Sequence, residues 1–158
     1  MGFEIERKFL IDHCKLNLES CLDVFSIQQG YLSQDPNRIV RVRKKNEKAF
    51  LTIKGKNVGY KRLEMEYEIP AEEATQLFEI CCPHLIEKKR YLLKIGKHTW
   101  EIDKFAGANL GLWLAEIELS SEEEEFERPT WITEEVTSDH RYSNSYLSQN
   151  PYKTWKEL

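Results

Sequence analysis

Apolar and charged residues alternate along most of this chain with a period of two. In the opening run, the charged side chains of Glu4, Glu6 and Lys8 share one set of alternate positions, while Ile5 and Phe9 belong to the other set. Successive side chains of a β-strand point to opposite faces, so the alternation predicts strands with one charged and one apolar face. Eight such strands are predicted, over residues 3–11, 26–33, 39–45, 49–54, 61–69, 88–95, 97–105 and 112–119.

Turn-forming sequences such as Asp35-Pro36-Asn37 separate most of these runs and predict successive antiparallel hairpins. Three helices are also predicted. The first covers residues 70–80 and begins at Pro70, the second covers 121–126 and begins with a capping box, and the last covers 139–148. The fold class is therefore mainly β (α+β), and we expect residues 1–158 to form a single domain.

The charged faces carry repeated charges of one sign. Arg41 with Arg43, and Glu116 with Glu118, place like charges about 7 Å apart on one face of a strand. A surface that only faces water ordinarily mixes both signs. Two interpretations stay open: these faces are the solvent side of an open sheet, or they line the inside of a closed barrel whose apolar faces point outward.

A charged interior requires partners, because unpaired charge away from water costs free energy. The basic residues of these faces are Lys8, Arg41, Arg43, Lys54, Arg62, Lys88 and Arg90. The acidic ones are Glu4, Glu6, Glu64, Glu66, Asp103, Glu116 and Glu118. Guanidinium and ammonium groups suit phosphate oxygens, and clustered carboxylates suit Mg²⁺ or Mn²⁺. Together the two sets predict a long, highly charged polyanion bound with a divalent cation.

Composition narrows the function further. The net charge of −4 argues against broad nucleic-acid binding, which needs surplus Lys and Arg on an outer face. No signal peptide or apolar membrane span is visible, so we expect a cytoplasmic protein that does not enter membranes. The four cysteines lack zinc-site spacing, and the four histidines are scattered, so neither set predicts a metal site. An edge-packed homodimer is compatible with the pattern.

The ordered motifs resemble those of the CYTH or triphosphate tunnel metalloenzyme family. Glu4-Ile5-Glu6-Arg7-Lys8 matches the N-terminal ExExK of that family. Segments that resemble the later motifs, in order, are 29–32, 41–43, 52–55, 62–66, 88–91, 100–105, 115–119 and 135–144. One departure is Thr133 after Trp131-Ile132, where related sequences often have Gly, and it bears on the shape of that loop.

The resemblance implies a closed eight-stranded antiparallel β-barrel, a triphosphate tunnel, with a few peripheral helices and a C-terminal helix near its mouth. It implies phosphate binding by Lys8, Arg41, Arg43, Lys54, Lys88 and Arg90, with Arg62 in the same set. It implies Mg²⁺ or Mn²⁺ binding by the acidic set above, with Glu4, Glu6 and Lys8 at the reaction centre. Tyr31 is expected to pack, and Asp139, Arg141 and Tyr142 to anchor the last helix at the rim. Contact with the substrate is the less favoured alternative for all four residues.

The reaction implied is metal-dependent hydrolysis of a small-molecule triphosphate. Inorganic tripolyphosphate, cleaved to pyrophosphate and phosphate, leads because the compact chain leaves little room for an element that recognises a base. Thiamine triphosphate, a nucleoside or RNA 5′-triphosphate, and cyclisation of ATP as in class IV-type adenylate cyclases stay as alternatives. A non-catalytic polyphosphate- or nucleotide-binding module is the alternative of a different class.

Overall fold

A computed structural model of the chain describes residues 5–58, 61–81 and 83–155. In this part of the chain, nine strands form one sheet in which every neighbouring pair is antiparallel, in the order β5-β4-β3-β2-β6-β7-β8-β1-β9. The strands are β1 (Ile5–Ile11), β2 (Asp23–Ser33), β3 (Arg38–Lys45), β4 (Lys48–Val58), β5 (Lys61–Ile69), β6 (Ile86–Ile95), β7 (His98–Ala106), β8 (Trp113–Leu119) and β9 (Ile132–Glu135).

The helices are few and short. Two are α-helical, α1 (Ala71–Phe78) and α2 (Asn144–Gln149). The others are single 3₁₀ turns: η1 (His13–Lys15), η2 (Gly107–Asn109), η3 (His140–Tyr142) and η4 (Tyr152–Thr154). Among the described residues, no helix is long and apolar enough to cross a membrane.

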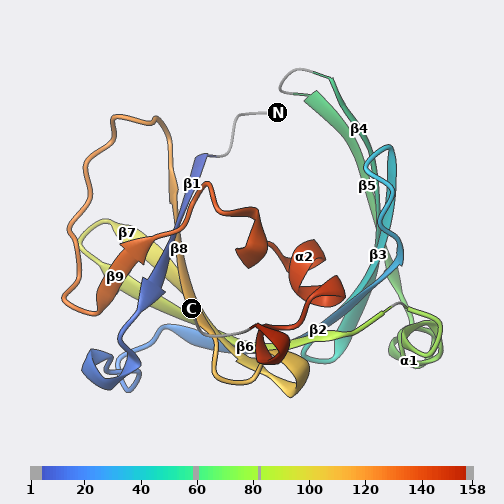
Figure 1. Ribbon diagram of the computed structural model, residues 1–158, viewed down its shortest axis with the longest axis horizontal. Coiled ribbons are helices and arrows are strands. Elements are labelled where there is room, and N and C mark those ends of the chain that lie inside the picture. Colours follow the sequence, from blue (N-terminus) through green and yellow to red (C-terminus); the bar gives the residue numbers. More distant parts are fainter. Residues whose placement is uncertain (1–4, 59–60, 82, 156–158) are drawn as a thin grey trace.

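The sheet curves into an open cup rather than a closed barrel (Figure 1). Its two edge strands, β5 and β9, do not pair in the described part of the chain, so the predicted closed eight-stranded barrel is wrong. The physical reason lies at β1. β9 pairs with the edge of β1 at Phe9 and Ile11. Directly after β9, the Val136 amide donates to the backbone carbonyl of Lys8 at 2.8 Å. That edge is therefore not available to β5.

The predicted strands are confirmed, with ends shifted by a few residues, but β9 was missed. Its four residues carry only one apolar side chain, Ile132, which is too short a pattern to indicate a strand. The helix expected at 70–80 is confirmed as α1, and Pro70 occupies its N-cap. The last helix is divided, because Ser143 adopts an extended conformation between η3 and α2 and accepts from the Tyr146 amide.

No helix forms at 121–126, where the capping box predicted one. The Glu124 carboxylate accepts from the backbone amide of Ser120 at 2.9 Å, and so caps a residue one position earlier than expected. The same carboxylate contacts the ring of His98 on β7. These two contacts hold residues 120–124 in a turn, and the chain continues without regular structure to β9.

Apolar side chains pack on both faces of the sheet. On the outer face, residues 120–132 cover a core that contains Phe9, Trp100 and Trp131 (Figure 1). Also outside, α1 packs Ala74 and Phe78 against β3 and β4. Inside the cup, α2 and η3 place Leu147 and Tyr142 in a third core with residues of β6, β7 and β8. The expectation that apolar residues all point away from the interior is therefore wrong at this end of the cup.

Gly30 of β2 lies in close contact with the segment that follows α1. A Cβ at this position would lie 2.7 Å from the Cβ of Cys81 and 2.7 Å from the Cδ2 of Leu85. We therefore expect Gly30→Ala to lower the free energy of unfolding by about 1–3 kcal/mol through overpacking. Urea unfolding followed by circular dichroism measures the change. Ser26→Ala, at an exposed position of the same strand, is the control, and an equal loss there contradicts the packing explanation.

Candidate active site

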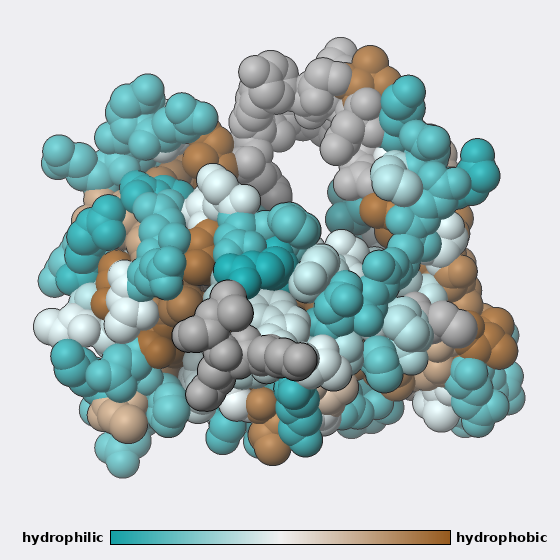
Figure 2. Space-filling view, in the orientation of Figure 1, coloured by the Kyte–Doolittle hydropathy of each residue, from teal (hydrophilic) through white to brown (hydrophobic). Residues whose placement is uncertain are grey.

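The charged faces of the strands line the inside of the cup. Cross-strand partners in an antiparallel sheet point to the same face. The register pairs Lys8 with Glu116 and Arg90 with Asp103 on one wall, and Thr52 with Glu66 on the other. Figure 2 shows a hollow between the two walls, with hydrophilic residues beside it. The open-sheet interpretation is therefore correct about the edges, yet the charged faces still share one interior.

Two arginines of β3 form the basic centre of one wall. The Arg41 side chain, on a residue that is 9 % exposed, donates from Nη2 to Thr52 Oγ1 at 3.3 Å and lies 3.9 Å from the Glu66 carboxylate. Its Nε is buried and has no hydrogen-bond partner among the described residues. Arg43 donates from Nε to the Gln29 amide oxygen at 3.1 Å, and no carboxylate of the described residues forms an ion pair with it. An unsatisfied buried donor beside an unpaired cation favours an anionic ligand.

The pKa of Arg43 reports the same excess of positive charge. Burial, reinforced by the charges of Arg41 and Arg90, lowers this pKa to about 10. Glu66 and Tyr31 act in the opposite direction and only partly offset the effect. A polyanion bound against this wall would relieve the repulsion among the three guanidinium groups.

Asp103 of β7 connects two further cations. The residue is 3 % exposed, and its carboxylate accepts from Lys88 Nζ at 2.9 Å and from Arg90 Nε at 2.8 Å. Burial opposes ionisation, but the charge of Lys88 and the hydrogen bonds from Arg90 outweigh it and lower the pKa of Asp103 to about 2. The structure therefore places Asp103 among the basic residues. Its oxygens hold Lys88 and Arg90 in position.

Carboxylates gather on the wall formed by β1, β7 and β8. A pocket of about 560 Å³ there is lined by residues that include Glu6, Glu101, Glu116 and Glu118. Burial and the neighbouring Glu116 and Asp103 raise the pKa of Glu101, although the Arg90 charge opposes this. Sequence reasoning passed over Glu101, although it shares the face of Asp103 in the run Glu101-Ile102-Asp103.

The acidic wall has the chemistry of a divalent-cation site. Carboxylate oxygens are the ligands that Mg²⁺ and Mn²⁺ prefer, and this wall places several of them around one pocket. Burial is the main cause of the raised pKa of Glu101, which also pairs with Arg90 at 2.9 Å. No group of three His, Cys, Asp or Glu side chains within the described ranges is already arranged around one point. The donor set thus fits a hard divalent cation in type, and its members would converge further on binding.

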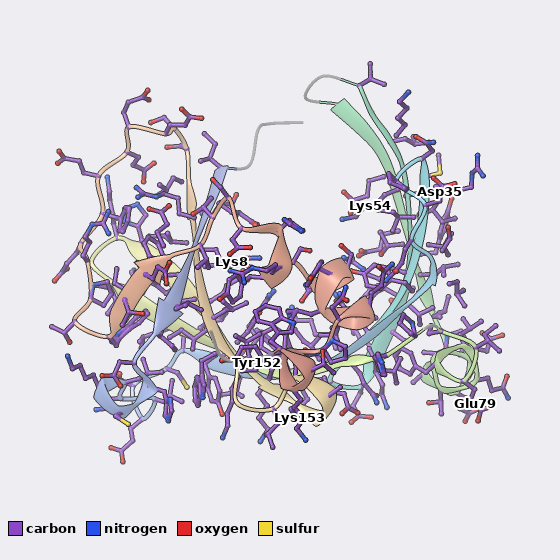
Figure 3. The ribbon with its side chains drawn as sticks, in the orientation of Figure 1. Lys8, Asp35, Lys54, Glu79, Tyr152 and Lys153 are labelled. Atoms are coloured by element: carbon purple, nitrogen blue, oxygen red, sulfur yellow. The ribbon has the colours of Figure 1, made fainter. Side chains whose placement is uncertain are left out.

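The remaining predicted residues divide between the two walls. Figure 3 shows Lys8 inside the cup beside η3, and Lys54 on the inner side of the opposite wall. Lys8 donates from Nζ to the Tyr142 carbonyl at 3.1 Å and lies 3.4 Å from Glu116. Glu64, paired in register with Lys54, lies with Glu66 on β5, opposite Glu116 and Glu118. The predicted acidic set is therefore split rather than gathered at one point.

Two predicted residues fall outside what the structure describes. Glu4 lies before the first described residue, and Arg62 belongs to β5 although its side chain lies outside the described part. At the rim, Asp139 binds Arg141 with a shortest separation of 2.6 Å, while Tyr142 is buried against α2 and η4 side chains.

An open antiparallel β-cup whose inner walls carry clustered basic and acidic side chains defines the class of protein. A family model described as CYTH domain matches residues 2–148 of this sequence. The chain therefore belongs to the CYTH domain family.

Relatives of known activity resemble the chain over nearly its whole length. It is 48 % identical, over 99 % of its own length and 100 % of the relative, to a protein of Acetivibrio thermocellus named inorganic triphosphatase. It is 35 % identical, over 92 % of its length and 96 % of the relative, to a protein of the same name from Nitrosomonas europaea. A crystal structure of an inorganic triphosphatase superposes with a TM-score of 0.76 at 33 % identity, covering 94 % of this chain and 95 % of that one.

Proposed function

We propose that this chain is a metal-dependent inorganic triphosphatase, which hydrolyses tripolyphosphate to pyrophosphate and phosphate inside the cup. The observation that carries the proposal is the near-full-length similarity to two proteins named inorganic triphosphatase. The cations of the Arg41–Arg43 wall support it, because Glu66 compensates them only in part and they suit a compound with several charged phosphates and no other recognition element. We further propose that residues 1–158 act as one such domain.

The residues of the two walls have separate tasks in this proposal. Arg41, Arg43 and Arg90 bind phosphate oxygens and stabilise the charge that develops on the departing pyrophosphate. Lys88 adds a further positive charge, and Asp103 fixes its direction. Because these groups are already ordered by Thr52, Gln29 and Asp103, little reorganisation accompanies binding.

The acidic wall would hold the cation and the attacking water. Glu6, Glu101, Glu116 and Glu118 line its pocket and would bind Mg²⁺ or Mn²⁺ there, together with Glu4. When bound, a divalent cation neutralises charge on the phosphate oxygens. Glu6 orients the water for in-line attack on the terminal phosphorus and accepts its proton, while Lys8 contacts the phosphate that is released.

Phosphate release from tripolyphosphate, thiamine triphosphate and ATP, each with Mg²⁺, with Mn²⁺ and with chelator, tests this function. We expect release from tripolyphosphate in the presence of either metal to exceed the other two substrates by at least about tenfold, and chelator to abolish it. Faster turnover of thiamine triphosphate or ATP would replace the proposed substrate. Cyclic AMP from ATP would indicate a cyclase, and tight tripolyphosphate binding without any product would indicate a binding module.

A further inference from the structure

A hollow on the outer side of the sheet lies behind the basic residues of the cup. Its volume is about 870 Å³, within the range of small-molecule sites, and residues of β2, β3, β6 and β7 line it. Lys89 belongs to its β6 side and Lys104 to its β7 side. Successive side chains of a strand point to opposite faces, so both lysines point away from the cup that contains Lys88, Arg90 and Asp103. We call this region the outer hollow.

The lysines of the outer hollow have no counter-charge of their own. Lys89 and Lys104 are direct cross-strand partners, and both are exposed. Like charges that lie opposite each other destabilise a sheet. Lys44 lines the hollow from β3, and none of the three lysines forms an ion pair within the described ranges. Lys104 Nζ lies 5.4 Å from the centroid of the Trp113 ring, a contact that leaves its charge in place.

Two carboxylates line the same hollow, those of Glu47 and Glu87. Glu87 accepts a hydrogen bond from Gln28 Nε2 at 3.2 Å, so one of its oxygens is already engaged. Glu47 belongs to the exposed turn between β3 and β4. Three ammonium groups therefore share the hollow with two carboxylates, and positive charge is in excess there.

Asn46 adds a neutral donor at the edge of the hollow. Its φ of 53° is a conformation that Asn adopts more readily than most residues, and it is fixed by a double contact with Ser26. The Asn46 amide donates to the Ser26 carbonyl at 2.9 Å, and Asn46 Oδ1 accepts from the Ser26 amide at 2.9 Å. Since a backbone amide can only donate, the oxygen must face Ser26, and the NH₂ group of Asn46 points away from it. In the described structure, neither this group nor the Ser26 hydroxyl has a side-chain hydrogen-bond partner.

We propose that the outer hollow is a second anion site, which binds a diphosphate group. Ammonium groups and uncommitted amide donors suit phosphate oxygens. Lys44 and Lys89 lie on strands separated by β2, and therefore about 10 Å apart across the sheet, so two linked phosphates contact both more readily than one does. The diphosphate is either inorganic pyrophosphate or part of an organic compound, whose remaining atoms would lie against the exposed Leu110 side chain. The site uses no residue of the cup and does not depend on the proposed hydrolysis.

Calorimetric titration in chelator with inorganic pyrophosphate and with ADP tests this site. Because the cup also binds phosphates, each titration uses the Arg41→Ala variant, in which we expect the cup to bind weakly and the outer hollow to bind as before. In this background, Lys89→Ala together with Lys104→Ala is expected to raise the dissociation constant at least about tenfold, since hydrogen bonds between charged groups are lost. With Arg41 intact, the same double substitution should leave kcat/KM for tripolyphosphate within about twofold of wild type.

Asn46→Asp tests the neutral donor separately from the lysines. The substitution keeps the oxygen that accepts from the Ser26 amide, but it replaces the NH₂ group by a negatively charged oxygen. We expect the dissociation constant to rise about tenfold with little change in melting temperature. Lys56→Ala together with Lys94→Ala is the matched control, because it removes the same charge from exposed positions outside the hollow, and it should leave affinity within about twofold.

Tighter binding of pyrophosphate would identify an inorganic ligand, and tighter binding of ADP an organic one, and either result supports the site. The inference is overturned if neither probe binds the Arg41→Ala variant, or if the Lys89 and Lys104 substitutions leave affinity unchanged. An equal loss in the control pair would also overturn it, because binding would then follow net charge alone. A wild-type protein that releases no phosphate from tripolyphosphate would remove the proposed function and leave this comparison intact.

Discussion

Replacing Arg41 by Ala is expected to lower kcat/KM for tripolyphosphate by about 10³-fold, the loss typical of a preorganised donor to developing charge. Arg41 is buried and donates from Nη2 to Thr52, so the side chain is ordered before any ligand arrives, while its Nε has no partner in the described structure. Steady-state phosphate release with Mg²⁺ measures the change. Turnover within tenfold of wild type would remove Arg41 from the proposed site.

A comparison of Arg41→Ala with Arg41→Lys separates charge from geometry. Lysine keeps the positive charge but not the planar fork that binds two oxygens, so we expect it to recover only part of the loss. Unlike activity, the stability of the Arg41→Ala variant is not expected to fall. Since Arg41 repels Arg43, its removal is expected to leave the free energy of unfolding unchanged or to raise it, as urea unfolding would show.

The alternation of side chains predicted most of the fold because period two is a local property. Once a residue such as Glu116 is placed on one face, Glu118 must share that face, and the register extends the rule to Lys8 on the neighbouring strand. The strands follow from this property, whereas α1 was predicted from Pro70 at its start, and the alternation alone left open whether the charged faces lie inside. The resemblance added the CYTH family, which the match of the family model to residues 2–148 confirmed.

Closure and the last elements depend on contacts that no local pattern records. Whether β1 pairs with β5 or with β9 depends on contacts between residues about 130 positions apart. For example, the backbone amide of Lys8 donates to the Thr137 hydroxyl at 3.0 Å. The capping box at Ser121 failed for a similar reason, because His98 of a different strand contacts the Glu124 carboxylate. A tertiary contact outweighed a local preference in both cases.

The sequence predicted which charged residues form the candidate site, and the structure shows how their side chains are arranged. Asp103 has the residue type of a metal ligand, but its buried position between Lys88 and Arg90 makes it a partner of cations. Gln29 and Tyr31 could not be selected by charge, since neither carries one. The register pairs them with Arg43 and Arg41 and so places them on the inner face of the cup.

Asp103→Asn is expected to have the largest effect on stability, a loss of about 3–5 kcal/mol in the free energy of unfolding. The substitution keeps the shape of the side chain but leaves Lys88 buried without its ion-pair partner, and Arg90 with only its ion pair to Glu101 at 2.9 Å. Urea unfolding at pH 7 measures the loss. Asp35→Asn, which breaks the exposed pair with Arg38, is the matched control and is expected to cost less than about 1 kcal/mol.

Acid unfolding distinguishes the ionised carboxylate of Asp103 from its volume. The pKa of Asp103 falls from an ordinary value of 3.8 to about 2 in the folded protein, so its ionisation contributes about 2 kcal/mol above pH 4. Because the folded pKa is the lower one, this contribution is present at neutral pH and is lost as the pH falls from about 4 to about 2. Asp103→Asn lacks the titrating group, so the difference in stability from wild type should shrink across that interval. A difference that stays constant down to pH 2 would show that the loss at neutral pH comes from packing, and that the Asp103 charge does not hold the two cations in the cup.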